Sequence, residues 1–268
     1  ELSIYQTIFD GWWHRALKGE KNVSWPGKIK YFALSSGTSE SSSKHIPVTK
    51  SMIRSIHKGT FKQILATKHF NFSKEQYQTE VLFVGGSTNL NFNGTCFTGD
   101  LSGITTGTQP LWFQNFSLPG PEIRAQKSWE DKLEEIVLNA KSWNVGFICG
   151  LPAWIQILFE RIIKHYQVKT IHDVWPNLAM FVHGGVSILP YKNSINNLCG
   201  KPLVYMDTYM ASEGFIAYQE RPNEAQAMKL MTDNQIFFEF IPFSGQYFDS
   251  EGNMLPNANA IDLSKVEL

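Results

Sequence analysis

The chain has 268 residues, of which 43% are hydrophobic and 13% aromatic, and this is enough to bury a large core. Its 24 Lys and Arg residues balance its 24 Asp and Glu residues, so no long-range field favours nucleic acid or an anionic membrane as a partner. We therefore expect a globular protein of one large domain or two small ones, in which any anionic ligand is bound by local groups.

The predicted elements alternate between strands and helices along the chain. Several of the strand-like runs are apolar at every position, as in strands that are covered on both faces. Three helices are predicted from the 3.6-residue apolar period, from Ser128 as an N-cap and from Pro152 in a first turn. This alternation predicts an α/β fold with parallel strand pairs. The predicted strands are 29–34, 81–84, 145–149, 178–183, 203–208 and 235–241, and the predicted helices are 49–68, 128–141 and 152–167.

The middle of the chain is less regular. Segment 85–121 is rich in Gly, Asn, Thr and Pro, which predicts hairpins and loops around short strands. The longest apolar stretch, 145–159, is shorter than the roughly 20 residues of a bilayer crossing and is interrupted by Pro152 and Gln156. We interpret it as a buried strand, a turn and a helix.

The cysteine pattern favours a cytoplasmic protein. Cys96, Cys149 and Cys199 are odd in number, far apart and without a CxxC spacing, which predicts reduced, buried thiols. Four Asn-X-Ser/Thr sequons would suit a secreted protein, but this short pattern is common by chance and no signal peptide precedes them.

The segment SSGTSESSSKHIP, residues 35–47, holds six serines directly after an apolar run. Between a strand and a helix, loop amides and a helix N-terminus converge, and hydroxyl groups add donors without charge, which suits a polyphosphate. Gly37 lets the backbone approach a ligand, and Lys44 can supply a positive charge. Neither GxxxxGK[ST] nor GxGxxG occurs, so the segment is either a different phosphate loop or a linker that binds nothing. The candidate hydroxyl donors are Ser35, Ser36, Thr38 and Ser39.

A second segment, VYMDTYMASEGFIAY at 204–218, contains polar residues directly after an apolar strand. This is the carboxyl edge at which open α/β sheets bind ligands. A carboxylate at this edge, Glu213, can hold Mg²⁺ beside a phosphate. The alternative is a Ser-Glu pair that stabilises the N-terminus of a helix. The candidate residues here are Tyr209, Ala211, Ser212, Glu213 and Gly214.

These two segments together resemble the Gretchen Hagen auxin-responsive promoter family. The approach NVSWPGKIKYFALSSGT to the first segment and FVHGGVSILPY before the second belong to the same resemblance, which runs from WPG to about Phe243. Members are acyl acid-amido synthetases within the adenylate-forming class, which includes acyl-CoA synthetases and firefly luciferase. The Ile-Pro pair after Lys44 is closer to bacterial than to plant members.

The resemblance implies an adenylate-forming α/β fold with mixed sheets and flanking helices. Residues 1–268 would form an incomplete, large N-terminal domain that binds ATP and the acyl group. The family pattern has further sequence before this segment, and after it an aspartate motif for the ribose and a mobile C-terminal domain, which are missing here. We therefore expect part of a larger enzyme, with weak nucleotide binding and no turnover by this chain alone.

The resemblance also implies residue roles. The loop residues would contact the ATP phosphates, the HGG segment would line the nucleotide site, and the strand-end residues would stack on adenine, contact phosphate or ribose, and hold the metal. Glu40 and Ser41 stand where many relatives have glycine, which puts a negative charge near the expected triphosphate. The implied cofactor-binding residues are Ser35, Ser36, Gly37, Thr38, Ser39, His183, Gly184, Gly185, Tyr209, Ala211 and Ser212, and the implied catalytic residues are Lys44 and Glu213, the latter also as metal ligand.

The implied activity is adenylation of a small carboxylic acid by ATP with Mg²⁺, followed by transfer of the acyl group to the amine of an amino acid. Two alternatives stay open: a thioester synthetase that uses coenzyme A, and a non-catalytic or degenerate nucleotide-binding fragment of the same fold. A serine hydrolase is disfavoured because no GxSxG occurs, and a zinc site is disfavoured because the seven histidines lack HExxH or CxxC partners. No nucleic acid or membrane partner is expected.

Overall fold

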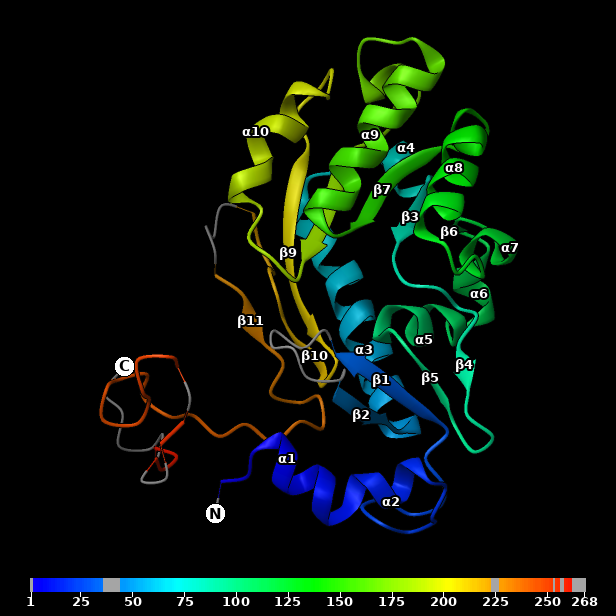
Figure 1. Ribbon diagram of the computed structural model, residues 1–268. Helices are drawn as coiled ribbons and strands as arrows, with labels where there is room; N and C mark the ends of the chain where they lie inside the picture. The colour runs from blue at the N-terminus through cyan, green and yellow to red at the C-terminus, as the bar shows by residue number, and fades with distance from the viewer. Residues whose placement is uncertain (1, 36–43, 223–226, 253, 256–257, 262–268) are drawn as a thin grey trace.

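The computed structural model describes residues 2–35, 44–222, 227–252, 254–255 and 258–261. Two β-sheets are packed with helices between and around them (Figure 1). The predicted α/β fold class, with mixed sheets and flanking helices, is therefore confirmed.

The larger sheet has seven strands in the spatial order β11-β10-β9-β8-β7-β3-β6. The five strands from β9 to β6 run parallel, whereas β10 and β11 are antiparallel additions at one side. The carboxyl ends of β3, β7, β8 and β9 therefore lie at one edge. The bounds are β3 (Glu80–Val84), β6 (Ser117–Leu118), β7 (Val145–Gly150), β8 (Met180–Gly184), β9 (Val204–Ala211), β10 (Gly214–Tyr218) and β11 (Lys229–Leu230).

The smaller sheet has the order β2-β1-β5-β4, in which β1 is parallel to β5 and the other pairs are antiparallel. Its strands are β1 (Tyr31–Ser35), β2 (Lys44–Val48), β4 (Asn91–Phe92) and β5 (Phe97–Gly99). Strand β2 corrects one prediction, because the serine-rich segment joins two antiparallel strands and does not lead directly into a helix. The run KHIPV begins with two polar residues and is too short to stand out as an apolar run, although Ile46 and Val48 are buried.

The predicted helices are confirmed, and two of them begin at caps that the sequence supplies. The Thr49 side chain accepts a hydrogen bond from the Met52 amide at 3.0 Å, and the Ser128 hydroxyl accepts one from the Asp131 amide at 3.2 Å. The helices are α1 (Tyr5–Ile8), the π-helical η1 (Phe9–Trp13), α2 (His14–Leu17), α3 (Lys50–Ala66), η2 (Thr67–Phe70), α4 (Lys74–Tyr77), α5 (Leu101–Gly107), α6 (Leu111–Gln114), α7 (Pro121–Arg124), α8 (Trp129–Asn139), η3 (Ala140–Ser142), α9 (Pro152–Tyr166), η4 (Ile171–Asp173) and α10 (Leu189–Asn197).

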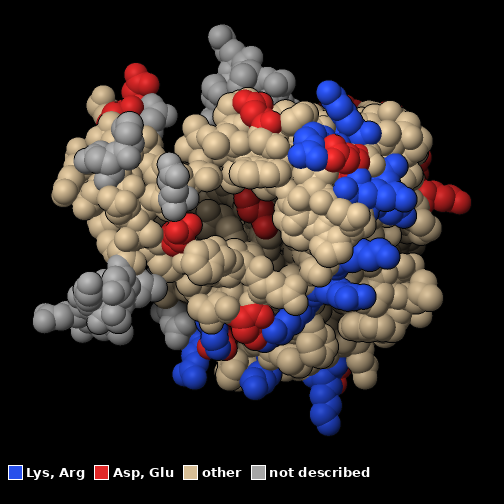
Figure 2. Space-filling model, turned by 90° about the horizontal axis from the view of Figure 1, so that it is seen from below, with Lys and Arg blue, Asp and Glu red and all other residues tan. Residues whose placement is uncertain are grey.

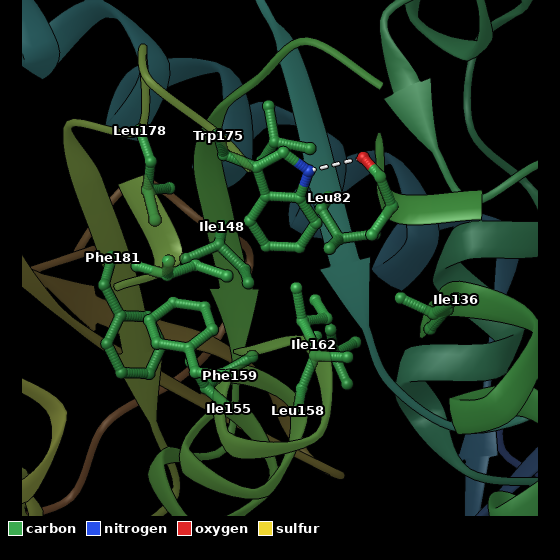
Figure 3. Close-up of a cluster of buried hydrophobic side chains, with 14 of the residues drawn as sticks. Leu82, Ile136, Ile148, Ile155, Leu158, Phe159, Ile162, Trp175, Leu178 and Phe181 are labelled. Carbon is green, nitrogen blue, oxygen red and sulfur yellow. Dashed lines mark hydrogen bonds between the residues drawn. The ribbon is translucent and has the colours of Figure 1, made fainter. Parts of the chain in front are cut away.

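One face of the seven-stranded sheet packs against α8, α9 and α10 (Figure 1). Strand residues such as Ile148 and Phe181 meet helix residues such as Phe159 in a cluster that excludes water (Figure 3). Trp175 is fully buried in this cluster, and its indole N–H donates to the Ala140 carbonyl at 2.8 Å (Figure 3). The bond satisfies the only polar atom of a large apolar side chain, so the whole ring adds to the core.

The opposite face packs against α3 and α5, which also contact the smaller sheet. Helix α3 approaches β10 closely because Gly59 faces the ring of the buried Phe215. The side chain of Asn234 is buried at the same place and donates to the Phe215 carbonyl at 2.6 Å. The parallel strands are therefore covered on both faces, as their continuous apolar runs predicted.

The predicted strand 235–241 is wrong. The structure gives no strand there, and the side chain of Phe237 is 87% exposed. An apolar run becomes a strand only when a neighbouring strand accepts its hydrogen bonds, and no ladder joins these residues to any strand in the described part of the chain.

Segment 85–121 contains the predicted hairpin, β4 with β5, but also two short helices that were not predicted, α5 and α6. Helix α5 has the sequence LSGITTG, which lacks strong helix formers. All three cysteines are free thiols, as predicted, although only Cys96 is fully buried. Within the described residues, no helix is both long and apolar enough to cross a bilayer.

The contact between α3 and β10 can be tested by Gly59→Ala. A Cβ atom at this position would lie 2.7 Å from Cγ of Phe215, so the ring or the helix must shift. We expect the free energy of unfolding to fall by about 1–3 kcal/mol, as measured by urea denaturation. The control is Gly11→Ala, because no atom lies within 4 Å of a Cβ there and alanine favours a helix. Equal effects of the two substitutions would contradict close packing at Gly59.

Candidate functional site

The carboxyl ends of the parallel strands form one edge of the larger sheet. Strand β9 runs downward in Figure 1 to its turn with β10, and Figure 2 shows the molecule from that side. This face is hollowed near its centre, and acidic side chains lie in and beside the hollow (Figure 2). The predicted candidate residues of the second half of the chain come from β8, β9 and the turn after β9.

The ASEG segment forms a tight hairpin between β9 and β10. Ala211 pairs with Gly214, so Ser212 and Glu213 are the two turn residues. The alternative of a helix N-terminus at Ser212 is therefore wrong, because the chain turns directly into an antiparallel strand. Glu213 is exposed at the tip, and the side chain of Tyr209 is 48% exposed. These side chains are accessible to a ligand.

Gly184 is the last residue of β8 and Gly185 follows it, and each position requires glycine. A Cβ atom on Gly184 would lie 2.2 Å from the Thr208 carbonyl oxygen of β9, and Gly185 has a φ of +79°. The first glycine permits close strand pairing and the second permits the turn that follows. Strand pairing and the turn explain the two glycines without a ligand. The predicted contact of the HGG segment with a nucleotide stays a prediction.

His183 is buried beside Asp207, its neighbour in the register of β8 and β9. Its Nδ1 atom lies 3.1 Å from Oδ1 of Asp207. Burial lowers the pKa of His183, nearby Asp207 opposes this shift, and Lys192 adds to it. We infer that the imidazole is neutral at neutral pH, since burial is the largest of these effects.

Asp207 was not among the predicted site residues. An acidic residue in the middle of the otherwise uncharged strand VYMDTYMA is unusual. This feature of the sequence could have identified Asp207 as a candidate site residue. Along β9, Asp207 and Tyr209 point to the same face because side chains alternate, and the register puts His183 on that face too. The structure therefore brings His183, Asp207 and Tyr209 together at the carboxyl edge.

The serine-rich segment begins and ends in a paired position, since Ser35 of β1 is opposite Lys44 of β2. The Nζ atom of Lys44 lies 5.4 Å from the ring centroid of Tyr5, and the Tyr5 hydroxyl accepts a hydrogen bond from the His45 amide at 2.8 Å. Tyr5 was not predicted to contact this segment. The predicted residues Ser36, Gly37, Thr38 and Ser39, together with Glu40 and Ser41, lie outside the described residues.

The two hairpins share one hydrophobic core. Ala33 of β1 and Ile46 of β2 belong to the same buried cluster as Met206 of β9 and Phe215 of β10. In Figure 1 the end of β1 and the β9–β10 turn lie in the same part of the molecule. Both hairpins are therefore anchored in the same part of the core.

Two cavities of the described part of the chain lie elsewhere. One, of about 300 Å³, lies between Lys30, Phe97 and helix α5. The other, of about 450 Å³, lies at the opposite, amino edge of β8 and β9, near Phe72 and Lys201. Of the predicted site residues that the structure describes, none lines either cavity.

The carboxylate of Glu213 is the one predicted metal ligand. Among the described residues, no group of three or more His, Cys, Asp and Glu side chains is arranged to hold a metal ion. A complete protein cage is therefore not formed in this part of the chain. Mg²⁺ in nucleotide sites is commonly held by one or two carboxylates together with the phosphates, and a single exposed carboxylate at a strand end fits that mode.

Comparison with known proteins supports the family resemblance. Residues 3–91 match the family model of the GH3 family N-terminal domain. The fold matches the solved structure "AtGH3.15 acyl acid amido synthetase in complex with 2,4-DB" with a TM-score of 0.62 at 13% identity, over 83% of this chain and 48% of that chain. A second structure, "GH3.15 acyl acid amido synthetase", matches with a TM-score of 0.63 at 12% identity, over 83% and 47%. No curated protein matches in a sequence search.

These matches confirm the predicted resemblance to this family, and they show that the fold is similar to that of the two acyl acid amido synthetase structures. ATP-bound MatB from Rhodopseudomonas palustris is a more distant likeness, with a TM-score of 0.41 at 12% identity over 86% of this chain and 45% of that chain, and no conclusion rests on it. The chain spans about half the length of the two acyl acid amido synthetase structures.

The contact of Tyr5 with the base of the serine-rich hairpin can be tested by Tyr5→Phe. The substitution removes the acceptor of the His45 amide but keeps the ring beneath Lys44. We expect faster hydrogen exchange at the His45 amide and a loss of about 1 kcal/mol in the free energy of unfolding. Tyr77→Phe, in α4, is the control and should leave the His45 amide unchanged. Unchanged exchange in Tyr5→Phe would show that the bond does not hold this hairpin.

Proposed function

We propose that the protein is an ATP-dependent acyl acid-amido synthetase, which adenylates a small carboxylic acid and transfers the acyl group to the amine of an amino acid. The observation that carries this proposal is the match of residues 3–91 to the GH3 family N-terminal domain, because these residues include the whole serine-rich segment. The fold shared with two acyl acid amido synthetases supports it.

In this proposal the β1–β2 hairpin binds the triphosphate. Ser35 lies at the end of β1, where its hydroxyl can donate to a phosphate oxygen, and Ser36, Gly37, Thr38 and Ser39 would add further hydroxyl and amide donors. The contact between Lys44 and the ring of Tyr5 is a cation–π interaction at the surface, which stabilises only weakly. Lys44 would therefore leave this ring and approach the phosphates.

The carboxyl edge of the larger sheet binds the nucleoside in this proposal. The half-exposed ring of Tyr209 offers a surface on which adenine can stack. His183 and Gly184 lie at the end of β8 and Gly185 follows them, so all three would line the site. Ala211 and Ser212 lie at the β9–β10 turn, where they would contact the phosphate or the ribose.

Mg²⁺ would be held by Glu213 and by phosphate oxygens, and when bound it would supply a positive charge that screens the triphosphate. The reaction requires such screening because the substrate carboxylate and ATP are both anions. Uncharged donors on the serine-rich hairpin stabilise the negative charge that grows on the phosphoryl oxygens, each by about 3 kcal/mol when it is preorganised. No nucleophilic side chain is needed.

The role of Glu213 predicts a specific dependence on magnesium. We expect Glu213→Ala to weaken binding of ATP in the presence of Mg²⁺ by about tenfold or more, because the metal-mediated contact is lost. Binding in EDTA should not weaken and should become somewhat tighter, because the substitution removes a carboxylate that repels the unscreened phosphates. Isothermal titration of the chain with ATP, with and without Mg²⁺, measures both values.

The matched control is Glu220→Ala at the other end of β10. Its carboxylate pairs with Lys229 at 2.5 Å, away from the turn. We expect this variant to bind Mg²⁺–ATP as the wild-type chain does. If Glu213→Ala retained the full magnesium-dependent gain, the metal would be bound elsewhere.

The substrates are tested by ATP–pyrophosphate exchange across a panel of carboxylic acids, in a preparation that supports turnover. Exchange that depends on one acid identifies the adenylated substrate. Consumption of the adenylate by an amino acid supports the amido synthetase, whereas consumption by coenzyme A would make the protein a thioester synthetase. Absence of both exchange and ATP binding would refute the proposed function.

A further inference from the structure

His183 has a buried nitrogen without a well-aligned hydrogen bond. Its side chain is 2% exposed, and Nδ1 has no correctly directed partner among the described residues. The nearest acceptor is Oδ1 of Asp207 at 3.1 Å. A buried polar atom without a partner is costly, so this contact has to become a hydrogen bond after a small rotation of either side chain.

The surroundings of the ring favour this pairing. The rings of Phe181 and Tyr205 lie 5.6 and 6.1 Å from the imidazole, and they provide no strong acceptor in its plane. Lys192 lies over Tyr205 and faces the same region, so its charge disfavours a protonated imidazole. Among the described residues, Asp207 is the carboxylate that lies against His183, and its backbone is fixed by two hydrogen bonds with Gln219.

The contact distinguishes between the two neutral tautomers. If the proton is on Nδ1, the ring can donate to Asp207 and the buried nitrogen is satisfied. If the proton is on Nε2, the lone pair of Nδ1 faces a negatively charged oxygen at 3.1 Å, which is unfavourable. The Nδ1–H tautomer is therefore the stable one while Asp207 is ionised, and Nε2 is left as a hydrogen-bond acceptor.

We propose that Asp207 is a positioning residue for ligand binding, which holds His183 as the Nδ1–H tautomer so that Nε2 accepts a hydrogen bond from an N–H or O–H group of the bound nucleotide. The hydrogen bond from the nucleotide to Nε2 rests on the proposed function, whereas the tautomer of His183 does not. The pairing of a histidine with a carboxylate that fixes its tautomer is the arrangement by which proteins commonly orient an imidazole toward a ligand.

His172 is a second buried histidine, and its contacts show how a histidine with a purely structural role is held in this fold. His172 is buried, and backbone groups serve both of its nitrogens: the Gly200 amide donates to Nδ1 at 3.1 Å, and Nε2 lies 3.0 Å from the Leu178 carbonyl. It lies at the amino edge of the sheet and uses no carboxylate. His183 differs in its charged partner, whose side chain is 29% exposed, and in its place at the ligand-binding edge.

The tautomers can be read by long-range ¹H–¹⁵N correlation spectra of the chain with labelled histidine. His172 is the internal reference and should be the Nε2–H form, since its Nδ1 accepts from Gly200. His183 should be the opposite, Nδ1–H form. In Asp207→Ala we expect His183 to change its tautomer while His172 does not. Asp207→Asn keeps an oxygen acceptor and should retain much of the Nδ1–H form. An Nε2–H form of His183 in the wild-type chain would overturn the proposal.

The proposed hydrogen bond between Nε2 of His183 and the nucleotide is tested by titrating the same variants with ATP. We expect Asp207→Ala to bind about tenfold more weakly, the equivalent of one lost hydrogen bond, and Asp207→Asn to bind nearly as the wild type does. Asp233→Ala, which removes an exposed carboxylate beside Lys58 and Lys62, is the control and should change neither binding nor the His183 tautomer. Circular dichroism shows whether each variant is folded.

The outcomes separate this proposal from the proposed function. If the wild type binds ATP and Asp207→Ala binds it equally well despite a changed tautomer, the positioning role is overturned and the nucleotide site stands. If the wild type does not bind ATP, the proposed function fails and the positioning role for a nucleotide fails with it, whereas the tautomer spectra still decide whether Asp207 holds His183.

Discussion

The pairing of β8 with β9 is the contact on which the candidate site depends. Its register places His183 opposite Asp207 and Gly184 opposite Thr208, and it is possible because glycine leaves room for the Thr208 carbonyl. A shift by one residue would turn His183 to the other face of the sheet, toward α3. Backbone packing therefore determines which side chains lie together at the carboxyl edge.

The sequence predicted the parts of the fold whose signals are local. Parallel strands covered on both faces appear as continuous apolar runs, and the start of α3 is marked by Thr49, whose side chain caps the helix. The candidate residues of the carboxyl edge were also predicted, because the position after an apolar strand in an α/β fold is a recognised ligand-binding place. These inferences needed neither the register of the sheet nor contacts distant in sequence.

The sequence could not predict features that arise from pairing between distant segments. Strand β2 exists because β1 accepts its hydrogen bonds, whereas the more apolar run 235–241 has no ladder partner among the described residues and forms no strand. Tyr5 reaches the His45 amide across 40 positions of sequence. The position of Asp207 beside His183 likewise follows from the register, which the composition of neither strand specifies.

The charges at the carboxyl edge explain why a nucleotide there would need a cation. Glu213 and Asp207 are acidic, burial lowers the pKa of His183 and so disfavours its charged form, and the ammonium group of Lys44 lies over Tyr5. Figure 2 shows acidic side chains in and beside the hollow, with Lys and Arg side chains farther out on the same face, and the chain as a whole has no net charge that would attract an anion. A triphosphate at this edge therefore meets negative charge unless a metal ion screens it, since like charges at short range repel strongly in a partly buried site. In the proposed site, hydroxyl and amide donors of the serine-rich segment would complement such a metal, because uncharged donors stabilise phosphate oxygens without adding a fixed charge.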